Sequence, residues 1–325
     1  MNAPSSSSSS SPRPSAAGRA LVVAGGGAAG NAWAIGVIAG LADAGVDVTV
    51  ADLIVGTSSG ATVAAQITGG PRPAELYSAI VEEPPLPDAH ARTGTVPGNG
   101  AGAGNGPRNS AGHGPARGVS GAGYLAWSDE VIASAADAAD MRRRMGAAAL
   151  ERDASDGAAG ARWRDVVAGR LPGTDWPQQR VVLVAVDART GEPVGLDRDS
   201  GVDLVDAVAA STSAMVPYPI GERRYLNGGY RRSENADLAA GYGRVLVLSP
   251  FGGRSRMPAA WRMDLASQVE ELRAGGSEVE TVFPDAGAGD VFDANALDPS
   301  TRLQAARGGH DQGRRLADRL RTFWV

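Results

Sequence analysis

The chain has 325 residues, of which 43% are hydrophobic, and its formal net charge is −5. This composition can fill one large core or two modest ones, and it lacks the basic stripe typical of nucleic-acid-binding proteins. Cysteine is absent, which excludes disulfides, cysteine-ligated metals and a thiol nucleophile. The few histidines are scattered and no acidic loop has calcium-binding spacing, so we expect no metal and no cofactor.

The first segment of the chain, residues 1–18, is a tail rich in serine and proline that cannot pack a core and is expected to be disordered. It has no cationic region followed by an apolar one, as a signal peptide would. Residues 21–41 are uncharged and long enough to resemble a membrane span, but glycines and Asn31 interrupt them. We favour a buried strand, turn and helix instead, and we expect a cytoplasmic protein with peripheral membrane contact at most.

The remainder, residues 19–325, predicts one α/β domain, because strands and helices alternate along it. Residues 84–123 are rich in glycine, proline and asparagine and predict a mobile insertion, either a lid or a tolerated loop. The expected strands are 20–24, 53–55, 181–186, 194–196, 244–248 and 279–283, with a hairpin at 223–231. The expected helices are 29–44, one after residue 60, 124–152, 202–213, 257–274 and 300–323.

A nucleophile elbow is predicted at Gly56-Thr57-Ser58-Ser59-Gly60, which follows a short apolar strand and precedes a helix of small residues. A serine on such a strained turn needs small neighbours, so that its hydroxyl projects and its backbone can approach an oxyanion. The pattern therefore indicates Ser58 as a nucleophile, flanked by Gly56 and Gly60.

A glycine loop lies between the first predicted strand and the first helix, with glycines at positions 25, 26, 27 and 30. Such a loop can direct backbone N–H groups at an anion, and the helix N-terminus adds positive potential. The same spacing also fits a dinucleotide fingerprint, for which Asp47 and Asp52 are loosely placed acidic partners, or a turn without a ligand. We favour the anion hole, because a dinucleotide domain does not need the strained turn at Ser58.

Three ordered motifs resemble the bacterial branch of the patatin-like phospholipases. They are GGGAAGNAWAIGVIAGLADAG for the glycine loop, VGTSSGATVAA for the elbow, and AVAASTSAMVPYPIGERRYLNGGYRRSENADLA for the segment of the second catalytic residue. The similarity extends through VLVLSP and LDPSTRLQAARGGHDQG, so it covers residues 19–320 except for 84–123.

This resemblance implies a three-layer α/β/α fold around a mostly parallel sheet, with a Ser–Asp dyad that hydrolyses acyl esters of lipids through an acyl-enzyme. Ser58 would be the nucleophile, and Gly25, Gly26, Gly27 and Gly30 would form the oxyanion hole. A lipid or related ester is then the expected partner. The resemblance says nothing of oligomeric state.

The residues themselves also argue against a Ser-His-Asp triad, since a triad needs a histidine. Two of the three histidines, His90 and His113, lie in the predicted insertion. The third, His310, lies on the predicted C-terminal helix, where a surface position is the simpler interpretation.

The chain departs from the family pattern where the aspartate of an Asp-Gly-Gly motif would stand, because it has Asn227 followed by two glycines. A carboxylate can accept the serine proton, whereas a neutral amide cannot. The chain is therefore expected to be a weak or inactive hydrolase, and a binding or regulatory protein on the same fold is the alternative. A second departure is Ala29, where the family has a cationic residue.

Four explanations for Asn227 stay open. The substitution is engineered; the protein is a natural non-hydrolytic relative; another carboxylate serves as base, with Asp237 and Asp187 as candidates; or Asn227 deamidates to aspartate or isoaspartate, since a following glycine does not hinder ring closure. A turn or helix-cap role is the plainer interpretation of Asp237.

Other segments have two interpretations each. Residues 216–219 form either a rigid connector or a wall of an acyl pocket. The arginines at 142–144 and 231–232 either contact anionic headgroups or lie on solvated faces.

Overall fold

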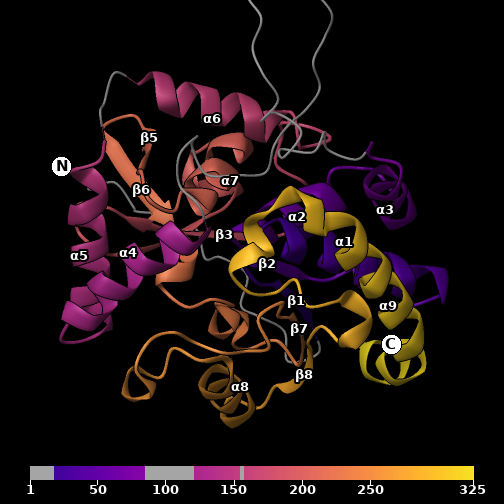
Figure 1. The fold of residues 1–325 in the computed structure, drawn as a ribbon. Helices are drawn as coiled ribbons and strands as arrows, with labels where there is room; N and C mark the ends of the chain where they lie inside the picture. Colours follow the sequence, from indigo (N-terminus) through magenta and orange to yellow (C-terminus); the bar gives the residue numbers. More distant parts are fainter. Residues whose placement is uncertain (1–17, 85–120, 154–156) are drawn as a thin grey trace, which may run out of the picture.

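The computed structural model describes residues 18–84, 121–153 and 157–325 (Figure 1). The predicted tail and the predicted 84–123 insertion fall almost wholly outside these residues. At the end of that insertion, residues 121–123 already form the start of a helix.

The strands are β1 (Arg19–Val23), β2 (Leu53–Thr57), β3 (Val181–Asp187), β4 (Pro193–Leu196), β5 (Tyr218–Ile220), β6 (Arg223–Asn227), β7 (Arg244–Leu248) and β8 (Glu278–Val282). The α-helices are α1 (Gly27–Asp43), α2 (Ser59–Thr68), α3 (Pro73–Val81), α4 (Gly121–Ser134), α5 (Ala138–Leu150), α6 (Ala158–Ala168), α7 (Leu204–Thr212), α8 (Leu265–Ala274) and α9 (Arg302–Trp324).

All described strands join one sheet in the order β5-β6-β3-β2-β1-β7-β8, with β4 paired to β3. The pairs β3–β2, β2–β1, β1–β7 and β7–β8 are parallel, whereas the pairs β3–β4, β3–β6 and β5–β6 are antiparallel. The central strands β1 and β2 are almost entirely apolar and buried, as expected of parallel strands covered on both faces.

Helices cover both faces of this sheet, which confirms the predicted α/β class. Alternate residues of β1 show the two sides: Leu21 and Val23 pack into the core beneath α1, α2, α7 and α9, while Ala20 and Val22 pack into the core beneath α8. Figure 1 shows the first group of helices and α8 on opposite sides of the strands. A third cluster, rich in methionine, lies under α4 and α5.

The strand β3 brings two distant parts of the chain together, because it extends beyond β2. Along one edge of β3, the last residue of β2, Thr57, pairs with Val184. The next residue of β3, Ala185, pairs with Asn227 at the end of β6. Since β4 occupies the opposite edge of the same residues, β2 and β6 must end beside each other. The elbow and the residue-227 turn therefore meet.

Several element boundaries differ from the predictions. The predicted helix 124–152 is two helices, since Asp137 caps the start of α5 by accepting the Asp140 N–H. The predicted helix 257–274 begins only at Leu265, where Asp264 is the cap. The hairpin lies at 218–227 rather than 223–231, because Gly221 adopts a positive φ that closes the turn. Helices α3 and α6 were not predicted.

The span-like stretch at residues 21–41 forms β1, a turn and most of α1 rather than one long helix. Within the described ranges, no helix combines the length and the apolar character needed to cross a membrane.

The helices α1 and α9 pack side by side at very short range, because glycines on each helix face the backbone of the other (Figure 1). A Cβ on Gly36 would lie 2.2 Å from the Ala306 carbonyl oxygen, and one on Gly40 would lie 2.1 Å from that of His310. From the other side, a Cβ on Gly313 would lie 2.3 Å from the Val37 carbonyl oxygen. The contact holds the buried helix α1, and the glycine loop at its start, against α9.

We predict that Gly40→Ala lowers the free energy of unfolding by about 1–3 kcal/mol, since the added methyl must push the two helix backbones apart. Gly173→Ala is the control, because nothing lies within 4 Å of a Cβ at that exposed position. Urea unfolding of both variants beside the parent protein measures the difference. Equal stability of the two variants would contradict the proposed packing.

Candidate active site

The elbow has the backbone geometry that its sequence predicts. Ser58 lies between β2 and α2 with φ 55° and ψ −125°, in a region that non-glycine residues rarely adopt. Both flanking glycines are sterically required: a Cβ on Gly56 would lie 2.7 Å from the Ala61 Cα, and one on Gly60 would lie 2.0 Å from the Val23 carbonyl oxygen. The turn therefore presents a half-buried serine hydroxyl at the end of the strand.

The side chain of Asn227 lies directly against this hydroxyl. Its Nδ2 donates a hydrogen bond to the Ser58 Oγ at 2.9 Å, and its Oδ1 accepts the Gly229 N–H at 2.9 Å. The Gly229 N–H can only donate, so it fixes the oxygen of the amide on its own side and leaves the NH₂ group facing Ser58. In this arrangement Asn227 donates to the hydroxyl instead of accepting its proton.

The other candidate bases make different contacts. Asp237 forms ion pairs with Arg231 and Arg232. Asp187 accepts the backbone N–H groups of Arg189 and Thr190 and so closes the turn after β3. Among the described residues, Asn227 is the one whose side chain hydrogen-bonds the Ser58 hydroxyl.

The histidine of the C-terminal helix lies in another part of the molecule. His310 is hydrogen-bonded to Asp43 at 2.8 Å and stacks on Tyr77, with ring centroids 4.4 Å apart. These contacts join α9 to α1 and α3. The other two histidines lie outside the described residues.

The glycine loop packs against Ser58, as a Cβ on Gly25 would lie 3.0 Å from the Ser58 Cβ. The Gly25 N–H donates to the Ser233 carbonyl oxygen at 3.3 Å, and the Gly26 N–H donates to the Ser59 Oγ at 2.9 Å. An oxyanion at this loop would compete with these two acceptors for the N–H groups. Gly27, with φ 63°, then starts α1.

The last glycine of the loop, Gly30, has a packing role. Its N–H donates to the Gly26 carbonyl oxygen as the first bond of α1, and a Cβ there would lie 3.0 Å from Pro250. The neighbouring Ala29 is fully buried, so this position carries no side chain that could reach an anion.

Sequence reasoning did not identify several polar residues beneath the site. Ser211 on α7 accepts the Ser58 N–H at 3.0 Å, and the Ser213 carbonyl oxygen accepts the Asn227 N–H at 2.7 Å. The end of α7 therefore contacts both residues of the pair. A serine within the apolar sequence of this helix was the available signal, but its partners lie far away in the chain.

A buried carboxyl group lies beneath the elbow. Glu234 is 1% exposed; its carboxyl accepts hydrogen bonds from Ser249 at 2.8 Å and Gln268 at 3.2 Å, and its carbonyl oxygen accepts one from Thr57. Burial raises the pKa of Glu234 above its ordinary value near 4.5, and Asp264 acts in the same direction.

We predict that this group makes stability depend on pH. Because the folded pKa is raised, the contribution of protonated Glu234 is fully present below about pH 4.5 and is lost as pH rises through the folded pKa. The Glu234→Gln variant has no carboxyl group to ionise and so does not lose this stability. The free energy of unfolding of the variant minus that of the parent should therefore increase with pH. Urea unfolding at several pH values measures the difference, and a difference that is constant with pH would contradict the expectation.

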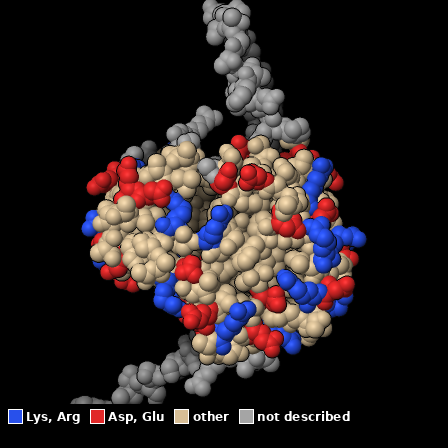
Figure 2. Space-filling model, turned by 60° about the horizontal axis from the view of Figure 1, so that its bottom comes forward, with Lys and Arg blue, Asp and Glu red and all other residues tan. Residues whose placement is uncertain are grey.

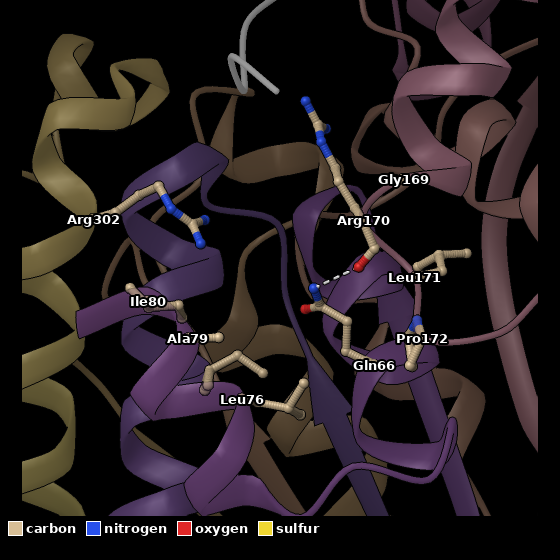
Figure 3. A pocket seen from close by; sticks show the side chains of 10 residues that line it. Gln66, Leu76, Ala79, Ile80, Gly169, Arg170, Leu171, Pro172 and Arg302 are labelled. Carbon is tan, nitrogen blue, oxygen red and sulfur yellow. Dashed lines mark hydrogen bonds between the residues drawn. The ribbon is translucent and has the colours of Figure 1, made fainter. Parts of the chain in front are cut away.

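A cavity of about 250 Å³ lies apart from Ser58, between α1, α2, α3 and the segment after α6 (Figure 3). Its wall includes Leu76 and Ile80 together with Arg170 and Arg302, and Gln66 donates to the Arg170 carbonyl oxygen at 3.0 Å. Burial, with the nearby Arg302, lowers the pKa of Arg170 to about 10. The cavity borders the far end of α2, roughly two helical turns beyond the elbow.

Within the described ranges, no group of three acidic or histidine side chains is arranged to hold a metal ion. On the face drawn in Figure 2, acidic and basic side chains are interspersed, without a broad area of one sign. The two predicted arginine clusters have acidic neighbours: Arg143 and Arg144 pair with Asp140, and Arg232 pairs with Glu271.

A comparison with protein-family models matches residues 21–240 to the patatin-like phospholipases. This stretch contains the glycine loop, the elbow and the residue-227 turn in their observed order. The chain belongs to the patatin-like phospholipase family. Proteins of this family are typically serine acyl hydrolases that act on lipids.

Among solved structures, this patatin-like chain is similar to VipD from Legionella pneumophila, with 12% identity and a TM-score of 0.41 over 97% of this chain and 72% of that one. It is also similar to the type III effector protein ExoU, with 15% identity and a TM-score of 0.35 over 93% of this chain and 54% of that one. The patatin-like chain thus spans about half the length of ExoU. A comparison with curated proteins found no match.

Proposed function

We propose that this patatin-like protein has the machinery of a serine acyl-ester hydrolase, with Ser58 as the nucleophile and the position of residue 227 as that of the base. The observation that carries the proposal is the 2.9 Å hydrogen bond between the side chains of Ser58 and Asn227, formed at a turn with positive φ. Family membership supports a lipid or related ester as the substrate.

In the proposed reaction, the Ser58 Oγ attacks the ester carbonyl carbon while a base removes its proton. N–H groups of the loop at Gly25 to Gly27 stabilise the oxyanion. As the intermediate collapses, the base passes its proton to the leaving oxygen, so that the alcohol departs and an acyl-serine remains. Water then attacks the acyl-serine while the same base takes its proton, and collapse of this second intermediate returns the proton to the Ser58 Oγ and releases the carboxylic acid.

In this chain the base step is impaired, because Asn227 donates to the hydroxyl and has no basic site for its proton. An aspartate at the same position would keep the contact with the Gly229 N–H through one oxygen and accept the Ser58 proton with the other. The missing base makes the chain as it stands a weak or inactive hydrolase, and the Gly25 and Gly26 N–H groups must also leave their present acceptors to meet an oxyanion.

The same hydrogen bond also favours a second candidate function. An acyl-binding or regulatory protein would retain the fold and the oxyanion loop while keeping Ser58 unreactive, and the donated amide hydrogen does this by withdrawing electron density from Oγ. In either case a bound ester or fatty acid would occupy the same site. Peripheral contact with a membrane would present such a ligand.

We predict that Asn227→Asp raises the hydrolysis of p-nitrophenyl esters at least about 100-fold over the parent, since it supplies the missing base. Ser58→Ala in the Asn227→Asp background is the control and should return the rate to that of buffer. If neither the parent nor Asn227→Asp exceeds this control, the hydrolase proposal fails; high activity of the parent alone would instead show that another group serves as base.

We also predict that deamidation of Asn227 is slow in the folded protein. Ring closure requires the Gly228 nitrogen to reach the Asn227 side-chain carbonyl carbon, which would break the hydrogen bonds to Gly229 and Ser58. Peptide mapping after long incubation should find conversion to aspartate and isoaspartate faster in urea than in native buffer. Equal rates under the two conditions would show that the folded structure gives no protection.

A further inference from the structure

A buried asparagine with unusual backbone geometry lies beneath the candidate site. Asn235 is 0% exposed and has φ 54° and ψ 35°, a left-handed conformation that asparagine tolerates better than most residues. It follows Glu234 in the loop between β6 and β7, eight positions beyond Asn227. A buried side-chain amide must satisfy its donors and its acceptor, so its partners indicate what it holds together.

The partners of this amide come from both halves of the site. The Asn235 Nδ2 donates to the Thr57 Oγ1 at 3.0 Å and to the Gly228 carbonyl oxygen at 3.2 Å. It also donates to the Arg232 carbonyl oxygen at 2.7 Å. Thr57 is the residue before Ser58, and Gly228 is the residue after Asn227. The amide is therefore one residue away from each member of the pair.

The orientation of this amide is fixed by a second set of contacts. The Arg231 Nη1 donates to the Asn235 Oδ1 at 2.7 Å and also to the Asp237 Oδ1 at 2.9 Å. A guanidinium group can only donate, so it holds the oxygen of the amide on its own side and directs the NH₂ group at Thr57 and Gly228. Asp237 thus acts on the site through Arg231 and Asn235, rather than by contact with Ser58.

We propose that Asn235 is a positioning residue, which refines the separation between the Ser58 hydroxyl and the side chain of residue 227 once the sheet has brought the two turns together. The backbone pairing on β3 brings the two turns together, and the amide of Asn235 joins them behind the reacting atoms. An aspartate could not replace it, because a carboxylate would face the Gly228 and Arg232 carbonyl oxygens without a hydrogen to donate. The catalytic consequence of this role rests on the proposed hydrolase function, whereas the structural role does not.

The test uses Asn235→Gly, because glycine adopts the left-handed conformation without strain and so removes the amide alone. Arg262→Gly is the matched control: Arg262 also has a positive φ, of 51°, but lies exposed at the surface. Urea unfolding of each variant measures its global stability, so that a change at the site can be separated from a general loss of folding.

The first measurement does not depend on catalysis. In the otherwise unaltered chain, loosening of the residue-227 turn should accelerate deamidation of Asn227 in native buffer. Peptide mapping should find faster conversion in Asn235→Gly than in the parent and Arg262→Gly, under conditions where all three remain folded. An unchanged rate in folded Asn235→Gly would overturn the positioning role.

The second measurement uses a fluorophosphonate probe in the Asn227→Asp background. We expect Asn235→Gly to slow labelling of Ser58 by about 10- to 100-fold, as misplacement of a reacting group does, while Arg262→Gly leaves it unchanged. Equal labelling rates with and without the amide would contradict the proposal. If the Asn227→Asp chain itself is not labelled, the hydrolase function fails, and the deamidation measurement still decides the role of Asn235.

Thr57→Val supplies a second variant should Asn235→Gly fail to fold. It removes the hydroxyl that accepts from Asn235 while keeping a side chain of similar volume. On its own, Thr57→Val should slow labelling of Ser58. Where both variants fold, their combined effect on labelling should be smaller than the product of the separate effects, because the two substitutions interrupt the same link. Independent effects, or no effect of Thr57→Val, would show that the amide does not act through Thr57.

Discussion

The candidate site depends on the length of one strand. Because β3 continues past the end of β2, its exposed edge accepts β6 in the antiparallel direction, and the two strands end at consecutive residues of β3. Backbone hydrogen bonds thus decide how close the elbow and the residue-227 turn lie. Side chains such as Ser211 and Asn235 then refine a spacing that the sheet has already established.

This division of labour means that the turn at residue 227 keeps its geometry with either an asparagine or an aspartate. The fold needs a residue at 227 that accepts the Gly229 N–H, and asparagine satisfies that need as well as aspartate. Asparagine and aspartate differ at the other terminal atom of the side chain, which faces Ser58. This atom is a donating nitrogen in asparagine and an accepting oxygen in aspartate. The fold therefore places no demand on the atom that faces Ser58, whereas the proposed hydrolysis depends on it.

The parts of the structure that could be predicted from sequence are those with local causes. The elbow and the glycine loop follow from glycines required within a few residues of one another, and the buried strands follow from apolar runs. The break before α5 and the late start of α8 depended on caps at Asp137 and Asp264 that a helical pattern conceals. Asn235 and Ser211 could not be identified because their partners are 178 and 153 residues away in the chain.

The glycine-lined contact between α1 and α9 has a consequence for how the protein is made. The helix α1 is buried on all sides in the finished fold. However, α9, which covers one of these sides, is the last of the described elements to be synthesised. During translation, α1 therefore emerges long before its cover, with an apolar surface open to other chains. Folding must wait for this late, long-range contact, so we expect slow folding and a need for chaperones that shield the nascent chain.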